Sequence, residues 1–272
     1  LDGVPFQSIA TYQLDGNAND LTGNYNGTAS NVTYSTGKFG QAATISGGAY
    51  IDTSLTYNSN ELTVSVWVYS TGTADQLRPL NTGNAASNKG YQVRIDPNGD
   101  ILWWLFANNS SAGLVTASSA FTLNQWNHIV GTYNQTTGDI KLYVNGEFKV
   151  GKTNIQTSTP STYPLRIGNQ VGTSDTQPYS IDQVRIYDKA ISAADVTTLY
   201  NETVATASTN PTFNVPSLVA YYKMSDATDE TGSYDGTPTN VNFNVAGKFG
   251  NAGEFNGSSS VVTLPNGITS AM

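Results

Sequence analysis

One segment of this chain occurs twice, and the repeat limits what the chain can fold into. Gly37-Lys38-Phe39-Gly40 returns 210 residues later as Gly247-Lys248-Phe249-Gly250. A period this long is typical of tandem domains, not of solenoid repeats of ~20–50 residues. We therefore expect a complete domain over residues 1–203, a linker over 204–216, and the opening part of a second domain over 217–272. Flanking matches extend the repeat: 10–12 with 220–222, 25–28 with 234–237, and 31–32 with 240–241.

The second copy matches only the opening third of the first and therefore lacks most of a domain. We expect that the chain continues beyond Met272 in the native protein, or that a neighbouring chain or the first domain supplies the missing strands by strand complementation. Open sheet edges invite such pairing. The apolar residues left without a core of their own would be Phe243, Phe255, Val261, Val262 and Leu264. The start at Leu1 is compatible with a segment of a longer or processed polypeptide, or with a chosen boundary.

The composition favours an all-β protein and excludes several partners. Of the 272 residues 38% are hydrophobic and only 12% are charged, with 26 Gly and 16 Tyr, as expected for pleated surfaces joined by turns. The net charge of −8 repels phosphate backbones, so we expect no nucleic-acid partner. The longest strongly apolar run, 101–107, is too short to span a membrane. The absence of cysteine rules out disulfides and thiolate sites.

Strand patterns recur along the first 190 residues. Residues 61–69 alternate, with Leu62, Val64, Val66 and Val68 on one face and Thr63, Ser65, Trp67 and Tyr69 on the other. Further strands are expected over 91–96, 100–106, 128–133, 139–144, 147–150, 163–168 and 179–187. One short helix should begin after Ser192, with Asp195 completing a capping box. Many short strands joined by turns predict an antiparallel sandwich or jelly roll.

Five segments in order resemble the laminin-G-like, concanavalin A-like domains. They are 10–27, 37–42, 62–68, 125–130 with 142–146, and 181–187 with 190–194. The resemblance covers about residues 1–203 and implies an all-β jelly roll of two curved antiparallel sheets. In the partial second copy, Ser225-Asp226-Ala227 departs from Asp15-Gly16-Asn17, which puts an equivalent metal site there in doubt.

Three residues in one acidic turn suggest a calcium site. Asp15, Asn17 and Asp20 are close in sequence, and the topology of the family implies that Asp182 approaches them. Carboxylate, amide and backbone oxygens are the ligands that Ca²⁺ requires. The alternative is that these residues only form Asx turns.

Aromatic residues on the predicted strands suggest a sugar-stacking site. Trp103 and Trp104 are adjacent, so one ring should point inward and the other outward. We name Trp103, Trp104 and Tyr91 as candidate ligand-binding residues; the alternative is that a loop or sheet edge covers the outward ring. Other contacts are expected on the rim loops 71–76, 83–89 and 173–178, because rigid sandwiches present function on loops.

Catalytic motifs are missing from the sequence. His128, the only histidine, is expected to be structural, held on a strand by packing and a hydrogen bond. The Glu-x-Asp-x-x-Glu pair of the glucanases that share this architecture is absent. We therefore expect a non-enzymatic extracellular, cell-surface or virion module for adhesion, decoration or assembly, such as a phage or bacterial appendage. Its partners would be glycans or neighbouring protein subunits. The alternative is a carbohydrate-binding module of a larger secreted glycan-active enzyme.

Overall fold

The computed structural model divides the chain into two compact units, residues 7–211 and residues 212–272 together with 1–6. It describes residues 7–56, 59–82, 90–107, 110–155, 163–173, 176–203, 207, 220–230, 232, 234–247 and 250–265. Apart from Ala207, the expected linker over 204–216 lies outside these residues, as does the rim loop 83–89. Each unit is considered separately below.

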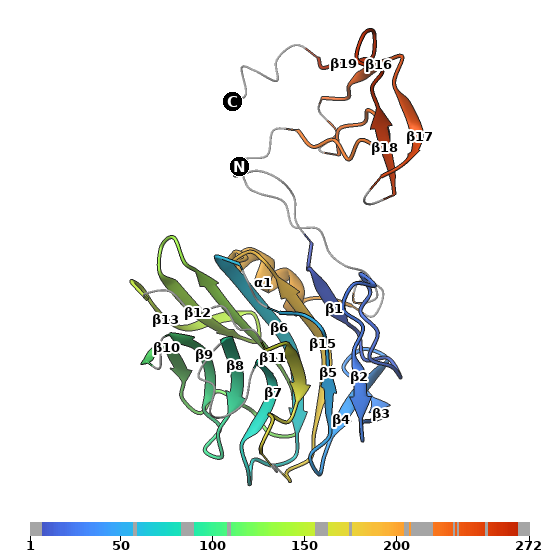
Figure 1. The fold of residues 1–272 in the computed structure, drawn as a ribbon. Helices are drawn as coiled ribbons and strands as arrows, with labels where there is room; N and C mark the ends of the chain where they lie inside the picture. Colours follow the sequence, from blue (N-terminus) through green and yellow to red (C-terminus); the bar gives the residue numbers. More distant parts are fainter. Residues whose placement is uncertain are drawn as a thin grey trace. The chain divides into compact units, whose positions relative to one another are not determined.

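The larger unit is a sandwich of two antiparallel sheets, which confirms the all-β jelly roll expected from the sequence (Figure 1). The first sheet has the order β13 (Glu147–Lys152), β12 (Asp139–Val144), β11 (Trp126–Asn134), β6 (Glu61–Ser70), β15 (Tyr179–Tyr187), β4 (Gln41–Ile45) and β3 (Thr33–Thr36), with β1 (Ala10–Tyr12) pairing with β15. The second has the order β10 (Ser110–Ala117), β9 (Ile101–Ala107), β8 (Gly90–Ile95), β7 (Leu77–Thr82), β14 (Leu165–Gly168), β5 (Tyr50–Asp52) and β2 (Thr28–Ser30).

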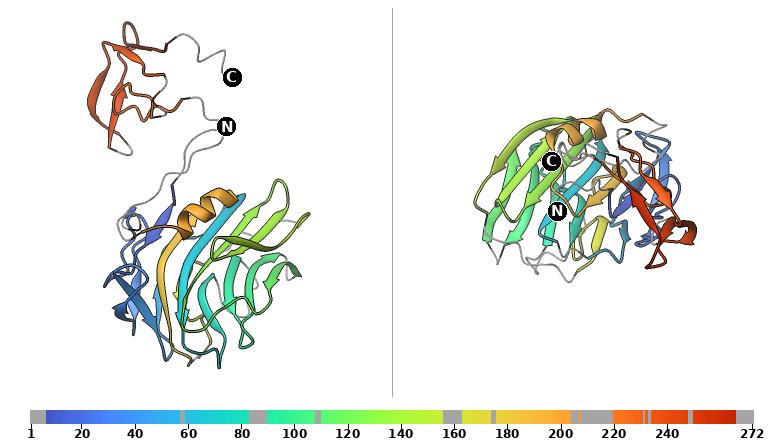
Figure 2. Two further views of the ribbon diagram at one scale, coloured as in Figure 1. Left: turned by 180° about the vertical axis from the view of Figure 1, so that it is seen from behind. Right: turned by 90° about the horizontal axis from the view of Figure 1, so that it is seen from above.

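The alternation of β6 positions both faces of the first sheet. Its apolar residues, Leu62, Val64, Val66 and Val68, are fully buried in the core between the sheets. The opposite face is buried too, which the alternating pattern does not predict. There Trp67 stacks on the ring of Tyr200 from α1 (Ala193–Tyr200), with ring centroids 5.7 Å apart. Figure 2 shows α1 lying against this sheet. The helix begins with the predicted capping box, in which the Ser192 hydroxyl and the Asp195 carboxylate each accept a backbone N–H.

The core is packed closely around Trp103. Its indole N–H donates to the carbonyl oxygen of Thr132 at 3.1 Å, which ties β9 of one sheet to β11 of the other. Gly131 lies directly against this ring, and a Cβ atom at Gly131 would overlap it. The absence of a side chain at Gly131 therefore provides the space for the indole.

The smaller unit contains two two-stranded antiparallel sheets among its described residues. β16 (Thr237–Thr239) pairs with β19 (Val261–Thr263), and β17 (Asn242–Ala246) pairs with β18 (Asn251–Glu254). Phe255, Val261 and Leu264 are each at least 40% exposed.

We predict that Gly131→Ala destabilises the larger unit, because the new methyl group must displace the Trp103 ring. Overpacking of this kind lowers the free energy of unfolding by roughly 1–3 kcal/mol, which urea denaturation would measure. Gly72→Ala is the matched control, since its Cβ would meet only the flexible end of the Gln177 side chain. Equal stability of the two variants would contradict the packing role of Gly131.

Candidate functional site

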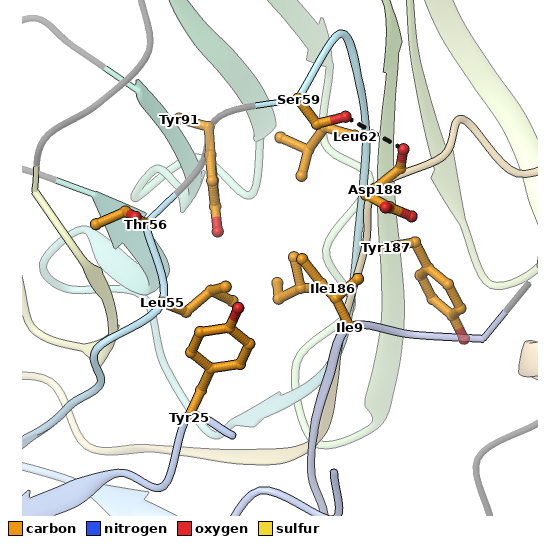
Figure 3. Close-up of a pocket in the computed structure, with 10 residues that line it drawn as sticks. All are labelled: Ile9, Tyr25, Leu55, Thr56, Ser59, Leu62, Tyr91, Ile186, Tyr187 and Asp188. Atoms are coloured by element: carbon orange, nitrogen blue, oxygen red, sulfur yellow. Dashed lines mark hydrogen bonds between the residues drawn. The ribbon is translucent and has the colours of Figure 1, made fainter. Parts of the chain in front are cut away.

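A pocket opens between the two sheets at one end of the sandwich, where contributing strands begin or end. It has a volume of about 260 Å³. Leu62 is the second residue of β6, Tyr187 is the last residue of β15, and Tyr91 is the second residue of β8. The lining residues are Ile9, Tyr25, Leu55, Thr56, Ser59, Leu62, Tyr91, Ile186, Tyr187 and Asp188 (Figure 3). We call this site the end pocket.

The end pocket combines apolar walls with a few polar groups. The aliphatic side chains of Leu55, Leu62 and Ile186 belong to the core. Figure 3 shows the hydroxyl group of Tyr91 directed into the space between the lining residues. At the upper rim, the Ser59 hydroxyl donates to the backbone carbonyl oxygen of Asp188 at 3.3 Å. Rings with dispersed hydroxyl groups suit a ligand that has both C–H and O–H surfaces.

Of the three predicted aromatic ligand contacts, only Tyr91 lines this pocket. Its ring also packs against Trp103, with centroids 5.8 Å apart. Trp103 is fully buried in the core, so a ligand could reach its ring only if the sheets separated. The predicted alternation of the two tryptophans is therefore observed, with Trp103 as the inward ring.

Trp104 is half-buried on the outer face of the second sheet. Phe106 packs beside it, with ring centroids 4.7 Å apart. The guanidinium carbon of Arg94 lies 5.8 Å from the indole centroid, and Arg94 forms an ion pair of 2.8 Å with Asp96. This surface is a second place where an aromatic ring adjoins hydrogen-bonding groups.

The four predicted calcium ligands separate into two places. Asp20 is buried, and its carboxylate accepts backbone N–H groups from Thr11 at 2.8 Å and Tyr25 at 3.1 Å. Asn17 forms a local Asx turn, in which its side-chain oxygen accepts the N–H of Asn19. These two residues therefore organise the loop before β2.

Asp15 and Asp182 instead meet at the turn between β3 and β4. Asp15 accepts the N–H of Gln41, and Asp182 accepts the N–H of Phe39 at 2.9 Å. A bulge in the pairing of β15 with β6 follows Asp182, and Gln183 within it has a left-handed φ of 48°. The backbone of the turn lies close to Asp182, since a Cβ atom at Gly37 would lie 2.7 Å from Asp182 Oδ2.

The environment of Asp182 is unfavourable for a bare carboxylate. Its side chain is fully buried, and within the described part of the chain its Oδ1 has no hydrogen-bond partner. Burial, followed by the charge of Asp15, raises the pKa of Asp182 to about 7. A cation beside these two carboxylates would offset both the cost of burying the Asp182 charge and its repulsion from Asp15. Of the four predicted calcium ligands, only Asp15 and Asp182 accept N–H groups of this turn. No cluster of three or more His, Cys, Asp or Glu side chains that could hold a metal ion occurs among the described residues.

His128 is buried under α1. Its Nε2 lies 2.8 Å from the Ser65 hydroxyl, and its ring stacks on Trp67 with centroids 4.8 Å apart. Burial, followed by the nearby cations Arg185 and Lys38, lowers the pKa of His128 to about 3. The imidazole is therefore neutral near pH 7, in the structural position expected from the sequence.

Two of the expected rim loops contact each other. The backbone N–H of Thr176 donates to the carboxylate of Asp75 at 3.0 Å. The hydrogen bond from the Thr176 hydroxyl, followed by this backbone hydrogen bond, lowers the pKa of Asp75. The contact joins loop 71–76 to the described part of loop 173–178.

Most residues of the end pocket have no signal in the sequence. Tyr25 lies before β2, Thr56 and Ser59 lie between β5 and β6, and Asp188 follows β15. Only the pairing of the strands brings these three segments together. A tyrosine followed by turn residues, as at Tyr25, is common throughout this chain and singles out no site. No helix among the described residues is long and apolar enough to cross a membrane.

Solved structures similar to this chain include several binding domains. The binding domain of Paraclostridial Mosquitocidal Protein 1 is 18% identical, with a TM-score of 0.58 over 72% of this chain and 52% of that chain. The receptor binding domain of botulinum neurotoxin D is 21% identical, with a TM-score of 0.57 over 71% of this chain and 52% of that chain. The chain thus spans about half the length of these toxin domains.

A third similar structure is matched along its whole length. Domain 4 of AbnA, a GH43 extracellular arabinanase from Geobacillus stearothermophilus, in complex with arabinotriose, is 22% identical. Its TM-score is 0.57, covering 73% of this chain and 100% of that chain. At these identities the likeness concerns the fold.

None of the curated proteins matches the sequence. The family model of the concanavalin A-like lectin/glucanases superfamily matches residues 41–197. The matched region is more than half of the 272 residues and includes β4 to β15 and most of α1. With the two-sheet jelly roll, this match shows that the chain belongs to the concanavalin A-like lectin/glucanases superfamily.

Proposed function

We propose that this chain is a non-catalytic glycan-binding module that works outside the cell, on a cell surface or a virion. The observation that carries the proposal is the end pocket, in which the side chains of Tyr25 and Tyr91 meet the hydroxyl groups of Thr56 and Ser59. The C–H face of a sugar ring packs on apolar and aromatic surface, while a few polar groups fix its hydroxyls.

The size of the end pocket limits the ligand. Its volume of about 260 Å³ lies just below the roughly 300–1,000 Å³ of typical ligand pockets. We infer that one sugar residue, at the end or side of a glycan, enters the pocket. The arabinotriose bound by the similar arabinanase domain supports a saccharide ligand as a class.

The chemistry of the site supports binding without catalysis. Glycoside hydrolysis generally needs two carboxyl groups on either side of the scissile bond. Asp188 is the only acidic residue among the described residues that line the end pocket. His128, which is neutral and buried under α1, is not among these lining residues.

Two biological settings fit such a module. In the first, it serves adhesion, decoration or assembly on a bacterial or phage surface, with partners that include neighbouring subunits. In the second, it is a carbohydrate-binding module of a larger secreted enzyme, and the arabinanase domain, which belongs to an extracellular enzyme, favours this setting.

The glycan proposal predicts that filling the end pocket abolishes binding. A glycan array followed by calorimetry identifies the ligand, and Thr56→Trp then places an indole at the mouth of the pocket. We expect affinity to fall by at least about tenfold, or 1.4 kcal/mol. Thr56 is exposed, so the sandwich itself should keep its stability.

Two control variants locate the site. Thr137→Trp adds the same side chain at an exposed turn between β11 and β12 and should leave binding unchanged. Trp104→Ala removes the aromatic ring from the outer face of the second sheet. Binding that survives Thr56→Trp and is lost in Trp104→Ala would place the site on that outer face, and a blank array would contradict the glycan proposal.

We also propose that Asp15 and Asp182 hold a calcium ion that fixes the turn between β3 and β4. The proposal rests on the unpartnered, buried Oδ1 of Asp182 and on the convergence of the two carboxylates at this turn. Asp20 and Asn17 would contribute indirectly, by holding the loop that carries Asp15. Calcium prefers such carboxylate and carbonyl oxygens.

The calcium proposal predicts opposite effects of pH with and without the ion. In EGTA, native Asp182, whose pKa is about 7, keeps a proton that the unfolded chain releases near pH 4. Stability should then fall from pH 4 to 7, by at most ~1.4 kcal/mol per pH unit. Calcium binds the ionised form and should restore stability at pH 7–8. Differential scanning calorimetry measures both effects, and Asp182→Asn should remove them. An unchanged melting temperature with calcium at pH 8 would reject the site.

A further inference from the structure

The smaller unit reproduces the opening loop of the larger unit in its hydrogen bonds. Asp229 is buried and accepts backbone N–H groups at 2.8 and 3.0 Å, as Asp20 does in the first unit. In each unit one tyrosine hydroxyl donates to the carbonyl oxygen of a second tyrosine. The equivalent pairs are Thr11–Asp20 and Tyr221–Asp229, Tyr25–Asp20 and Tyr234–Asp229, and Tyr12–Tyr25 and Tyr222–Tyr234.

The backbone repeats as well, at positions where coincidence is improbable. Leu14 has a left-handed φ of 63° and Met224 one of 61°. Asn31 and Asn240 have φ values of 56° and 53°. Residues other than glycine rarely adopt this conformation, so its recurrence at equivalent places indicates the same local fold.

The strand pairs of the smaller unit are equivalent to pairs in the sandwich. β16 with β19 corresponds to β2 with β5, and β17 with β18 corresponds to β3 with β4. In the sandwich, β5 pairs further with β14, and β4 pairs further with β15. Among the described residues of the smaller unit, β18 and β19 have no such second neighbour.

Burial differs between the two units where β14 and β15 have no counterpart among the described residues of the smaller unit. Within the loop it is the same, with Ala18 and Ala227 exposed by 5% and 6%. Ile45 is fully buried beside Tyr179 of β15, whereas Phe255, 210 residues later, is 47% exposed. The exposed side chain of Phe255 therefore marks part of the surface that β15 covers in the larger unit.

We propose that residues 220–263 are a preformed acceptor for a strand with the pattern of β15 that comes from outside residues 1–272. The strand would pair antiparallel with β18, with its counterpart of Tyr179 opposite Phe255. The chain's own β15 is not available, because it already pairs with β1, β4 and β6. This inference goes beyond glycan binding and does not depend on it.

Charge and preorganisation favour this occupant over a second copy of the smaller unit. Residues 217–272 contain two lysines and five acidic residues, so two copies would repel each other. A neutral or basic strand is the better complement, and β15 with its flanks at 177–189 contains two basic and two acidic residues. Both strand pairs and the Asp229 loop are formed without the strand, so little ordering is needed on binding.

The test uses the whole chain and a fluorescent synthetic peptide of residues 177–189, with a scrambled peptide as reference. Saturable binding of the native peptide is expected in an anisotropy titration. Phe255→Asp should weaken it by at least about tenfold, because a charge then enters the apolar contact. Phe148→Asp is the matched control, since Phe148 is 57% exposed on β13 of the larger unit, and it should have no effect.

The register is tested by disulfide trapping, which is unambiguous because the chain has no cysteine. A peptide with Tyr179→Cys should couple to Phe255→Cys and not to Val261→Cys on the other sheet. The proposal is overturned if the two positions couple equally or if the native peptide binds no better than the scrambled one. Self-association in sedimentation experiments, abolished by Phe255→Asp, would identify a second copy as the occupant and would also overturn it.

Discussion

The position of β15 in the middle of the first sheet is the constraint on which the rest of the sandwich depends. Residues 179–187 come late in the domain, yet they pair with β1 and β4 from its beginning and with β6. The sheet therefore cannot be completed without β15, which immediately precedes α1 in the sequence. Contacts between residues so far apart in sequence form only after a large loop-closure cost. The pocket depends on the same strand, since Ile186 and Tyr187 form part of its wall.

β15 is buried on both faces, because the outer face of this sheet is covered as well. Arg185 lies on β15, and its guanidinium pairs with Glu202 at 2.8 Å, with both side chains almost fully buried. A buried charge is tolerated only when it is paired and hydrogen-bonded. The pair therefore requires the chain after α1 to stay against the sheet. This cover also buries His128 and Trp67, so the closing strand, the helix and the segment after it act together.

Local patterns in the sequence predict the elements well, because they depend on neighbouring residues. The alternation of residues 61–69 predicts β6, and Ser192 with Asp195 predicts the start of α1. The burial of Ser65 and Trp67 could not be predicted in this way, because the residues that contact them come much later in the sequence: His128 hydrogen-bonds to Ser65, and Tyr200 of α1 stacks on Trp67. The end pocket has no sequence signal for the same reason: the strand pattern indicates Tyr91, but Tyr25 and Asp188 reach the pocket only through the topology of the sheets.

The predicted calcium ligands also differ in whether local or long-range contacts position them. Asp20 is held by backbone N–H groups within its own loop. Asp229 is held in the same way in the smaller unit, whose described residues include no counterpart of β15. Asp182 meets Asp15 only because β15 lies beside β4. The loop around Asp20 is thus specified by about fifteen residues of sequence, whereas the Asp15–Asp182 pair exists only in a completed sheet. Comparison of the two units therefore shows that the loop around Asp20 forms from local sequence, whereas the position of Asp182 beside the turn between β3 and β4 depends on β15.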